Sequence, residues 1–205
     1  MTKRTTLIAA LAATAAFTAG CGSSSSSSTA AKQTSQAKAA KPKAKAKENL
    51  PPGDIPDTQA FVAFAPAGGG FIVKVPEGWS RSGSGSKVTF SANLNSITVE
   101  RRKGGGAVSA AAAKTTEVPA MARSFKNFKL QSIGTVKRSA GTAVRIRYLA
   151  TGKPNAVTGK ADTEAAERYL FSHGGSEMVL TLAGPKGADN VDPWKIVTDS
   201  LRWTK

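Results

Sequence analysis

Few side chains in this sequence have the type and spacing that catalysis requires. His173 is the only histidine, and it stands beside two glycines in an expected turn, with no second histidine to complete a typical zinc site. Asp162, Glu164 and Glu167 form a local acidic group, but acid and base catalysis needs carboxylates placed across a cleft. No serine lies in a Gly-x-Ser-x-Gly turn, and no glycine run completes a phosphate-binding motif. We therefore predict a chain that is not an enzyme and that carries no metal or other cofactor.

The only cysteine, Cys21, stands at the end of a segment with the features of an export signal. A cationic start precedes an apolar run over residues 7–17, which is too short to span a bilayer. Ala19-Gly20 immediately before the thiol resembles the bacterial lipobox, in which the cysteine is acylated and becomes the first residue after cleavage. Thr18 stands where the usual lipobox has leucine. Ordinary secretion, with Cys21 left as a free thiol, is the alternative.

The composition divides the chain into three parts. Residues 1–20 are predicted to be the lipoprotein signal peptide. Residues 21–60, rich in serine, alanine and lysine, lack apolar mass and periodicity and are predicted to form a flexible tether that starts at lipidated Cys21. Residues 61–205 have the length of a single domain. The expected location is the cell membrane, with the protein lipid-anchored at the extracytoplasmic face.

The chain is strongly basic, with a formal net charge of +16. From residue 51 onward, 21 basic residues stand against 12 acidic residues. Such a balance often indicates nucleic acid, but export argues against that partner and favours anionic lipid or a cell-wall polymer. One candidate basic binding face consists of Arg101, Arg102, Lys103, Arg145 and Arg147. The alternative is a solvated sheet surface, since the polar side of a half-exposed strand often carries arginine.

Residues 61–205 show the hydrophobic alternation of several β-strands. In Val144-Arg145-Ile146-Arg147-Tyr148, the apolar side chains face one side and both arginines face the other. Residues 88–99 predict a hairpin, and residues 80–86, rich in glycine and serine, predict a mobile loop. Ser109 is a suitable N-cap for an alanine-rich helix, and Asp192-Pro193 fits the start of a terminal helix. Few helices among hairpin-linked strands predict an α+β domain, with an antiparallel β-sheet covered by a few helices.

The order of these elements resembles the PsbP-like fold, which is also seen in LpqN-type bacterial lipoproteins. The matching segments are 71–79, the strand that ends at Tyr148, the hairpin over 169–182, and Asp192-Pro193-Trp194 through Leu201. The resemblance implies a non-catalytic accessory or binding domain. It does not identify the partner, because proteins that share a fold bind different partners.

Two functions follow as expectations. The first is a membrane-anchored extracytoplasmic lipoprotein that acts as an interaction or accessory module for another envelope protein. The alternative is a lipid- or glycan-binding carrier, which requires an apolar pocket with a few convergent polar groups. Trp79, Trp194 and Trp203 would suit a sugar or lipid platform, but packing in a core is the expected role of aromatic residues in a small domain.

Overall fold

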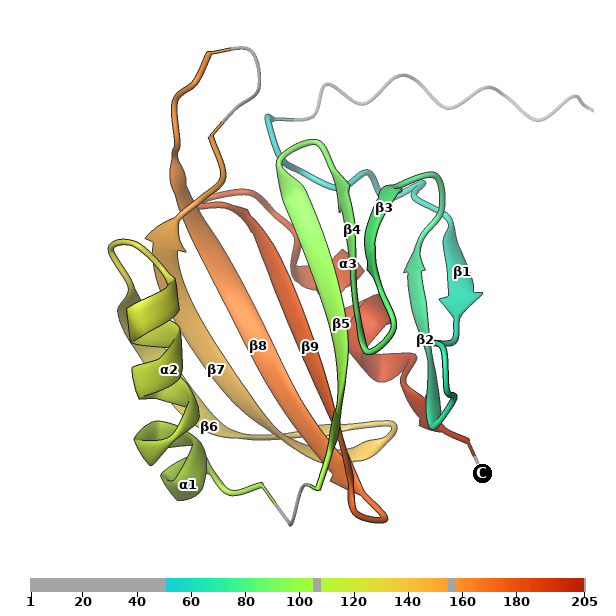
Figure 1. Ribbon diagram of the computed structural model, residues 1–205. Helices are drawn as coiled ribbons and strands as arrows, with labels where there is room; N and C mark the ends of the chain where they lie inside the picture. The colour runs from blue at the N-terminus through green and yellow to red at the C-terminus, as the bar shows by residue number, and fades with distance from the viewer. Residues whose placement is uncertain (1–50, 105–107, 155–157, 205) are drawn as a thin grey trace, which may run out of the picture. The chain divides into compact units, whose positions relative to one another are not determined.

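A large antiparallel sheet organises the part of the chain that the computed structural model describes, residues 51–104, 108–154 and 158–204. Its seven strands lie in the order β3-β4-β5-β9-β8-β7-β6 (Figure 1). Hairpins join most neighbours, whereas β5 pairs with β9 from a distant part of the chain. The strands are β3 (Ser80–Ser84), β4 (Lys87–Ala92), β5 (Asn95–Lys103), β6 (Lys129–Arg138), β7 (Gly141–Thr151), β8 (Thr163–His173) and β9 (Ser176–Pro185).

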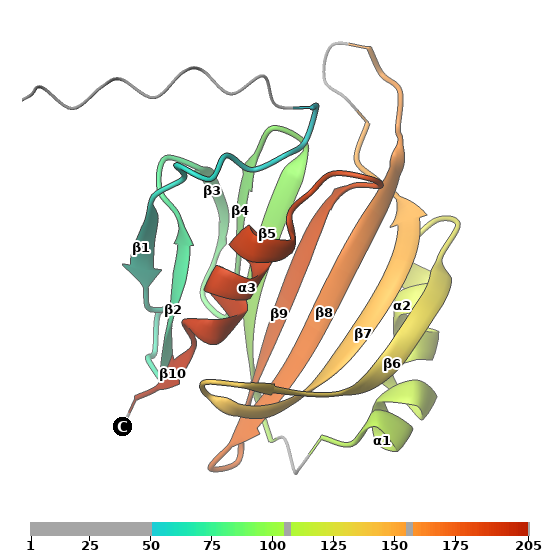
Figure 2. The ribbon, with the colours of Figure 1, turned by 180° about the vertical axis from the view of Figure 1, so that it is seen from behind.

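Each face of the large sheet is covered by different elements. Helices α1 (Ala110–Thr115) and α2 (Glu117–Ser124) lie over β6 and β7 on the face seen in Figure 1. Helix α3 (Val191–Asp199) lies on the opposite face (Figure 2). A smaller antiparallel sheet, in the order β1-β2-β10, is on the α3 side. Its strands are β1 (Phe61–Phe64), β2 (Phe71–Pro76) and β10 (Arg202–Trp203).

Two apolar cores form, because successive side chains of a strand point to opposite faces of the sheet. The α3-side core consists of Phe64, Phe71, Val73, Val75, Val88, Phe90, Ile97, Val99, Ala143, Tyr169, Phe171, Met178, Leu180, Leu182, Val197 and Leu201. The α1-side core consists of Ala113, Met121, Val144, Ile146, Tyr148, Ala150, Ala166, Leu170, Val179 and Ala183. The predicted α+β class, with an antiparallel sheet covered by a few helices, is confirmed.

The folded region begins before residue 61, so residues 51–60 do not belong to the tether predicted over 21–60. Ile55 is only 5% exposed, and its backbone N–H donates to Asn190 Oδ1 at 2.9 Å. The Gly53 carbonyl accepts hydrogen bonds from Asn95 and Asn190. These partners lie far along the chain, so composition alone could not reveal that this proline-containing segment packs against the domain. Residues 1–50, with the predicted signal peptide, Cys21 and most of the tether, lie outside the described residues.

Two local predictions differ from the structure. Residues 80–84 form edge strand β3 and not a loop, because backbone pairing with β4 is possible without an apolar pattern. Gly83, with φ +80°, is needed there, since a Cβ would lie 2.6 Å from the Lys87 carbonyl oxygen. The terminal helix starts at Val191 after Asn190, whose side chain bonds to residues 53, 55 and 95 and does not cap the helix.

Other local predictions are confirmed. Ser109 caps α1 by accepting a hydrogen bond from Ala112 N–H at 3.1 Å. The hairpin of β4 and β5 closes with Ala92 opposite Asn95. All three tryptophans pack against the α3-side core, as expected for core aromatics.

Candidate functional site

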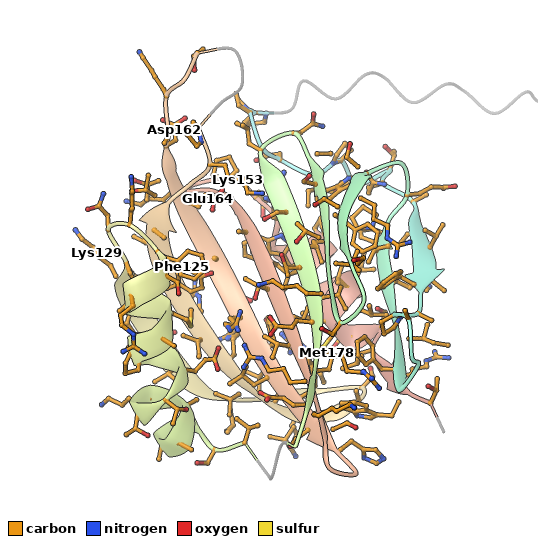
Figure 3. All side chains as sticks on the ribbon, viewed as in Figure 1. Phe125, Lys129, Lys153, Asp162, Glu164 and Met178 are labelled. Atoms are coloured by element: carbon orange, nitrogen blue, oxygen red, sulfur yellow. The ribbon has the colours of Figure 1, made fainter. Side chains whose placement is uncertain are left out.

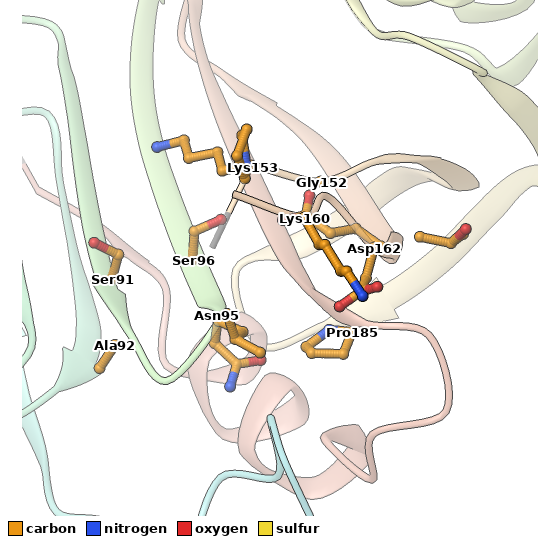
Figure 4. Close-up of a pocket in the computed structure, with 13 residues that line it drawn as sticks. Ser91, Ala92, Asn95, Ser96, Gly152, Lys153, Lys160, Asp162 and Pro185 are labelled. Carbon is orange, nitrogen blue, oxygen red and sulfur yellow. The ribbon is translucent and has the colours of Figure 1, made fainter. Parts of the chain in front are cut away.

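A pocket of about 330 Å³ opens at one end of the large sheet. We call it the loop pocket. The turn between β4 and β5 lies on one side, and the segment between β7 and β8 lies on the other (Figure 4). Its lining residues are Ser91, Ala92, Leu94, Asn95, Ser96, Gly152, Lys153, Pro154, Lys160, Asp162, Thr163, Glu164 and Pro185.

The turn between β4 and β5 supplies an apolar side chain to this pocket. Asn93 and Leu94 both have positive φ, +47° and +67°, as a type I′ hairpin turn requires. Leu94 is 45% exposed. With Ala92, Pro154 and Pro185, it gives the loop pocket an apolar lining that is not covered by other described residues. This lining is suited to an apolar part of a ligand.

Charged groups of both signs surround the apolar lining. Lys153, Asp162 and Glu164 gather at the same end of the sheet (Figure 3), and Lys160 completes the set. Glu164 packs over Gly152, where a Cβ would lie 2.6 Å from the glutamate Cγ. Burial raises the pKa of Glu164, and the hydrogen bond and charge of Lys153 act against burial without cancelling it. The loop pocket therefore combines apolar surface with a few polar groups, as ligand sites do.

The raised pKa of Glu164 predicts a stabilising substitution. Since the folded protein binds this proton more tightly than the unfolded chain, the carboxyl contributes less stability as pH rises through its folded pKa. Glu164→Gln, neutral at every pH, should therefore raise the melting temperature at pH 7 and change it little at acidic pH. Thermal unfolding followed by circular dichroism measures this. The exposed Glu77→Gln is the control, and an equal or lower melting temperature for Glu164→Gln at pH 7 would contradict the prediction.

The carboxylates in the lining of the loop pocket, Asp162 and Glu164, come from the same short stretch of chain. Among the described residues, no group of three or more histidine, cysteine, aspartate or glutamate residues is placed to hold a metal ion. His173 stacks on Trp203 at the turn between β8 and β9, with ring centroids 5.3 Å apart.

A partly buried ionic cluster holds α2 against the sheet, and sequence reasoning missed it. Glu117, the first residue of α2, accepts two hydrogen bonds from Arg102 of β5, at 2.9 and 3.2 Å. It also accepts one from Arg168 of β8, at 2.6 Å. Arg168 is 8% exposed and also donates to Thr181 at 2.9 Å. The alternation of side chains along β8 could have predicted that Arg168 is buried, because Arg168 lies between Ala166 and Leu170 on the face of the strand that points to the core.

The electrostatics of the cluster follow from its geometry. Burial acts to raise the pKa of Glu117, but the hydrogen bonds and charges of Arg102 and Arg168 outweigh it and hold this pKa below its usual value. The hydrogen bond to Glu117 is also the main reason that the pKa of Arg102 is raised. On the same face, burial raises the pKa of Tyr148 to about 12. The hydrogen bonds of Glu117 hold the start of α2 against β5 and β8.

The five residues predicted to form one basic binding face are divided between the two faces of the sheet. Arg102 lies on the α1 side, where it binds Glu100 and Glu117. Arg145 and Arg147 lie on the opposite side, near Glu167. The register of the strands explains this division. Arg102 pairs with Glu177 of β9, and both side chains point to the α1 side. Arg145 and Arg147 alternate along β7 with Val144 and Ile146, which belong to the α1-side core, so both arginines point to the other face.

The two remaining basic residues lie apart from the arginines of β7. Arg101 donates to the Gly68 carbonyl at 3.2 Å, and Lys103 is exposed at the end of β5. Only Arg145 and Arg147 of the predicted set therefore share one site.

The predicted attachment of the protein to the membrane depends on a residue that the structure does not describe. That residue is Cys21, so its acylation stays a prediction. Within residues 51–104, 108–154 and 158–204, no helix has the length and hydrophobicity to cross a membrane.

Comparisons with known proteins identify the fold. Cyanobacterial PsbP from Synechocystis matches with a TM-score of 0.53 at 11% identity, over 71% of this chain and 94% of that one. The PsbP-like fold is confirmed. The PsbP-like domain is also similar to the Ran-binding protein Mog1p of Saccharomyces cerevisiae, with a TM-score of 0.50 at 13% identity, over 71% of this chain and 96% of that one. At such identities the likeness concerns the fold alone.

A further structural match is LpqN of Mycobacterium tuberculosis, described as involved in cell envelope biogenesis. Its TM-score is 0.40 at 13% identity, over 73% of this chain and 93% of that one. No family model matches the sequence. No curated protein matches it either.

Proposed function

We propose that this chain is a lipoprotein held at the extracytoplasmic face of the cell membrane by acylated Cys21, with its PsbP-like domain serving as a non-catalytic accessory module for another envelope protein. The observation that supports the proposal is a PsbP-like domain in a chain that begins with a cationic start, an apolar run over residues 7–17 and Ala19-Gly20-Cys21. Mog1p, which has a similar fold, binds another protein, Ran. A fold of this type therefore serves as a binding scaffold, while the partner depends on the surface of each protein.

The physical properties of the chain fit this role. Each methylene that enters the bilayer contributes about 0.8 kcal/mol, so two or three acyl chains hold a protein far longer than one. The segment between Cys21 and residue 51, treated as a flexible coil, would give the domain a reach of about 30 Å. The excess of basic over acidic residues from residue 51 onward favours contact with anionic envelope components.

Replacing Cys21 tests the anchor directly. Cys21→Ser is expected to leave the precursor uncleaved or to release the protein from the membrane, because serine offers no thiol for acylation. Fractionation of cells and metabolic labelling with a fatty acid measure both effects. Thr18→Leu, which restores the usual lipobox residue, is the matched control and should be processed. A Cys21→Ser protein that is still processed and membrane-bound would contradict the proposal.

Native mass spectrometry of the lipidated protein, extracted from its own membrane in mild detergent, tests the accessory role. The proposal predicts an added mass of tens of kilodaltons, from a protein partner. Charge-changing substitutions on the domain surface can then locate the contact. Recovery of the chain alone, from membranes where cross-linking also finds no neighbour, would contradict an accessory role.

The loop pocket favours a second candidate function, a lipid- or glycan-binding carrier. Its volume of about 330 Å³ is at the lower end of the range for ligand sites. In the same mass spectra, a few hundred daltons beyond the expected acyl groups would favour the carrier. Ala92→Trp, which fills the pocket, should then abolish that added mass, whereas Ser82→Trp on edge strand β3 should not.

A further inference from the structure

A second cavity, of about 320 Å³, lies beside α3 on the face of the sheet opposite α1 and α2. We call it the arginine pocket. Strand β7 contributes Arg145 and Arg147, β6 contributes Arg138, and α3 contributes Trp194 and Lys195. Figure 2 shows α3 on this face of the sheet, with β7 and β6 beyond β8. The cavity is separate from the loop pocket except for Pro185, which lines both.

In the arginine pocket, a single carboxylate forms ion pairs with two guanidinium groups. Glu167 Oε1 lies 3.7 Å from Arg145 Nη1 and 3.2 Å from Arg147 Nε. The other oxygen, Oε2, accepts the hydroxyl of Tyr169 at 2.5 Å. Because each guanidinium has five N–H donors, Glu167 can satisfy only a minority of them. The side chains of Arg145 and Arg147 are 33% and 55% exposed, so solvent or a ligand can reach the rest.

The charges of this site do not balance. Arg138, Arg145, Arg147 and Lys195 supply four positive charges. Against them stand Glu167 and Asp199, the latter 3.6 Å from Arg138 Nε and 2.9 Å from Lys195 Nζ. The excess of two positive charges matches a phosphate monoester, which carries nearly two negative charges at pH 7. A carboxylate would neutralise only one.

The ring of Trp194 and the start of α3 complete the lining of the cavity. The indole Nε1–H is itself buried and has no hydrogen-bond partner among the described residues, so this donor does not face the open space. The start of α3, through Asn190 and Val191, also lines the cavity, and the positive end of a helix dipole favours an anion.

We propose that the arginine pocket binds a phosphate group, supplied either by a soluble phosphate monoester or by the headgroup of a membrane lipid. Arg145 and Arg147 bind the phosphate oxygens through their free N–H groups, as arginine forks do with phosphate. Lys195 adds charge at the rim. The proposal does not depend on the accessory role or on the loop pocket, because it rests only on residues of this cavity.

The test uses the full lipidated protein in nanodiscs of phosphatidylcholine, titrated with sn-glycerol 3-phosphate and followed by calorimetry. The double variant Arg145→Gln/Arg147→Gln should weaken binding about tenfold or more, because it removes two charge-assisted contacts. Arg123→Gln/Arg202→Gln is the matched control, since it removes the same charge from exposed positions outside the cavity. Lys195→Gln, which removes one positive charge from the rim of the cavity, should also weaken binding, but less than the double variant does.

The two sources of phosphate are distinguished by adding phosphatidic acid to the nanodiscs. If phosphatidic acid weakens the binding of glycerol 3-phosphate, the site binds a lipid headgroup. If the affinity for glycerol 3-phosphate is unchanged, the site binds a soluble monoester. If the arginine double variant does not fold, the single variants Arg147→Gln and Lys195→Gln carry the test. The proposal is overturned if binding is absent, if acetate binds as tightly as the phosphate monoester, or if the control double variant loses as much affinity as the pocket variant.

Discussion

Replacing Glu117 with alanine is expected to lower the free energy of unfolding by about 3 kcal/mol. The substitution leaves Arg168, which is 8% exposed, without a carboxylate partner. Its Nε already lacks a hydrogen-bond partner in the described structure, and only Thr181 would still accept a bond from the guanidinium. Removing one member of a buried ion pair is costly, because the charge that remains is desolvated and uncompensated. Urea unfolding followed by circular dichroism measures the loss.

Two further variants separate charge from packing. Glu117→Gln keeps the shape and one acceptor oxygen and should lose less stability than Glu117→Ala. The double variant Glu117→Leu/Arg168→Met replaces the pair with apolar groups and should recover most of the loss, because buried pairs are often no more stabilising than well-packed apolar residues. A loss for Glu117→Ala no greater than that of the exposed Glu77→Gln would contradict the predicted role of the cluster.

The pH dependence gives an independent check on the same cluster. Because folding lowers the pKa of Glu117, its contribution to stability is present above the pKa of an unfolded carboxyl and is lost as pH falls through the folded pKa. The wild-type protein should therefore lose stability in that acidic range more steeply than Glu117→Gln. The Glu164→Gln comparison has the opposite sign, since folding raises the pKa of that carboxyl.

The second large effect is expected from Asn190→Ala, at about 2–3 kcal/mol. Asn190 is 3% exposed and makes three hydrogen bonds, to Ile55 N–H, the Gly53 carbonyl and Asn95 Oδ1. Truncation leaves the buried Ile55 N–H without an acceptor. Residues 51–60 should then separate from the domain more easily, and hydrogen exchange of their amides should become faster.

Urea unfolding and hydrogen exchange with mass spectrometry measure these two effects. Gln131→Ala is the matched control, because it removes an exposed amide from edge strand β6 and should change stability by less than about 0.5 kcal/mol. If Asn190→Ala lowers stability without faster exchange over residues 51–60, then Asn190 does not hold that segment in place.

Patterns carried by neighbouring residues were sufficient to predict much of the fold. Alternation placed Val144, Ile146 and Tyr148 on a buried face and Arg145 and Arg147 on the other, as the structure has them. Side-chain chemistry placed the N-cap at Ser109. Such features depend on contacts a few residues apart, so the sequence states them directly. Strand β3 escaped prediction because its pairing depends on the backbone of β4 and not on apolar side chains.

The sequence by itself determined the antiparallel α+β character of this protein and the shortage of residues suited to catalysis. The tertiary structure alone decided which charged residues meet. Pairing of β5 with β9 puts Arg102 on the α1 side, and α2 brings Glu117 to Arg168, 51 positions along the chain. The tertiary structure also brings Trp194 of α3 and the arginines of β7 into the lining of one cavity. The physical reason is that register between distant strands is set by packing of the whole core, and moving a strand by one residue reverses the face of every side chain.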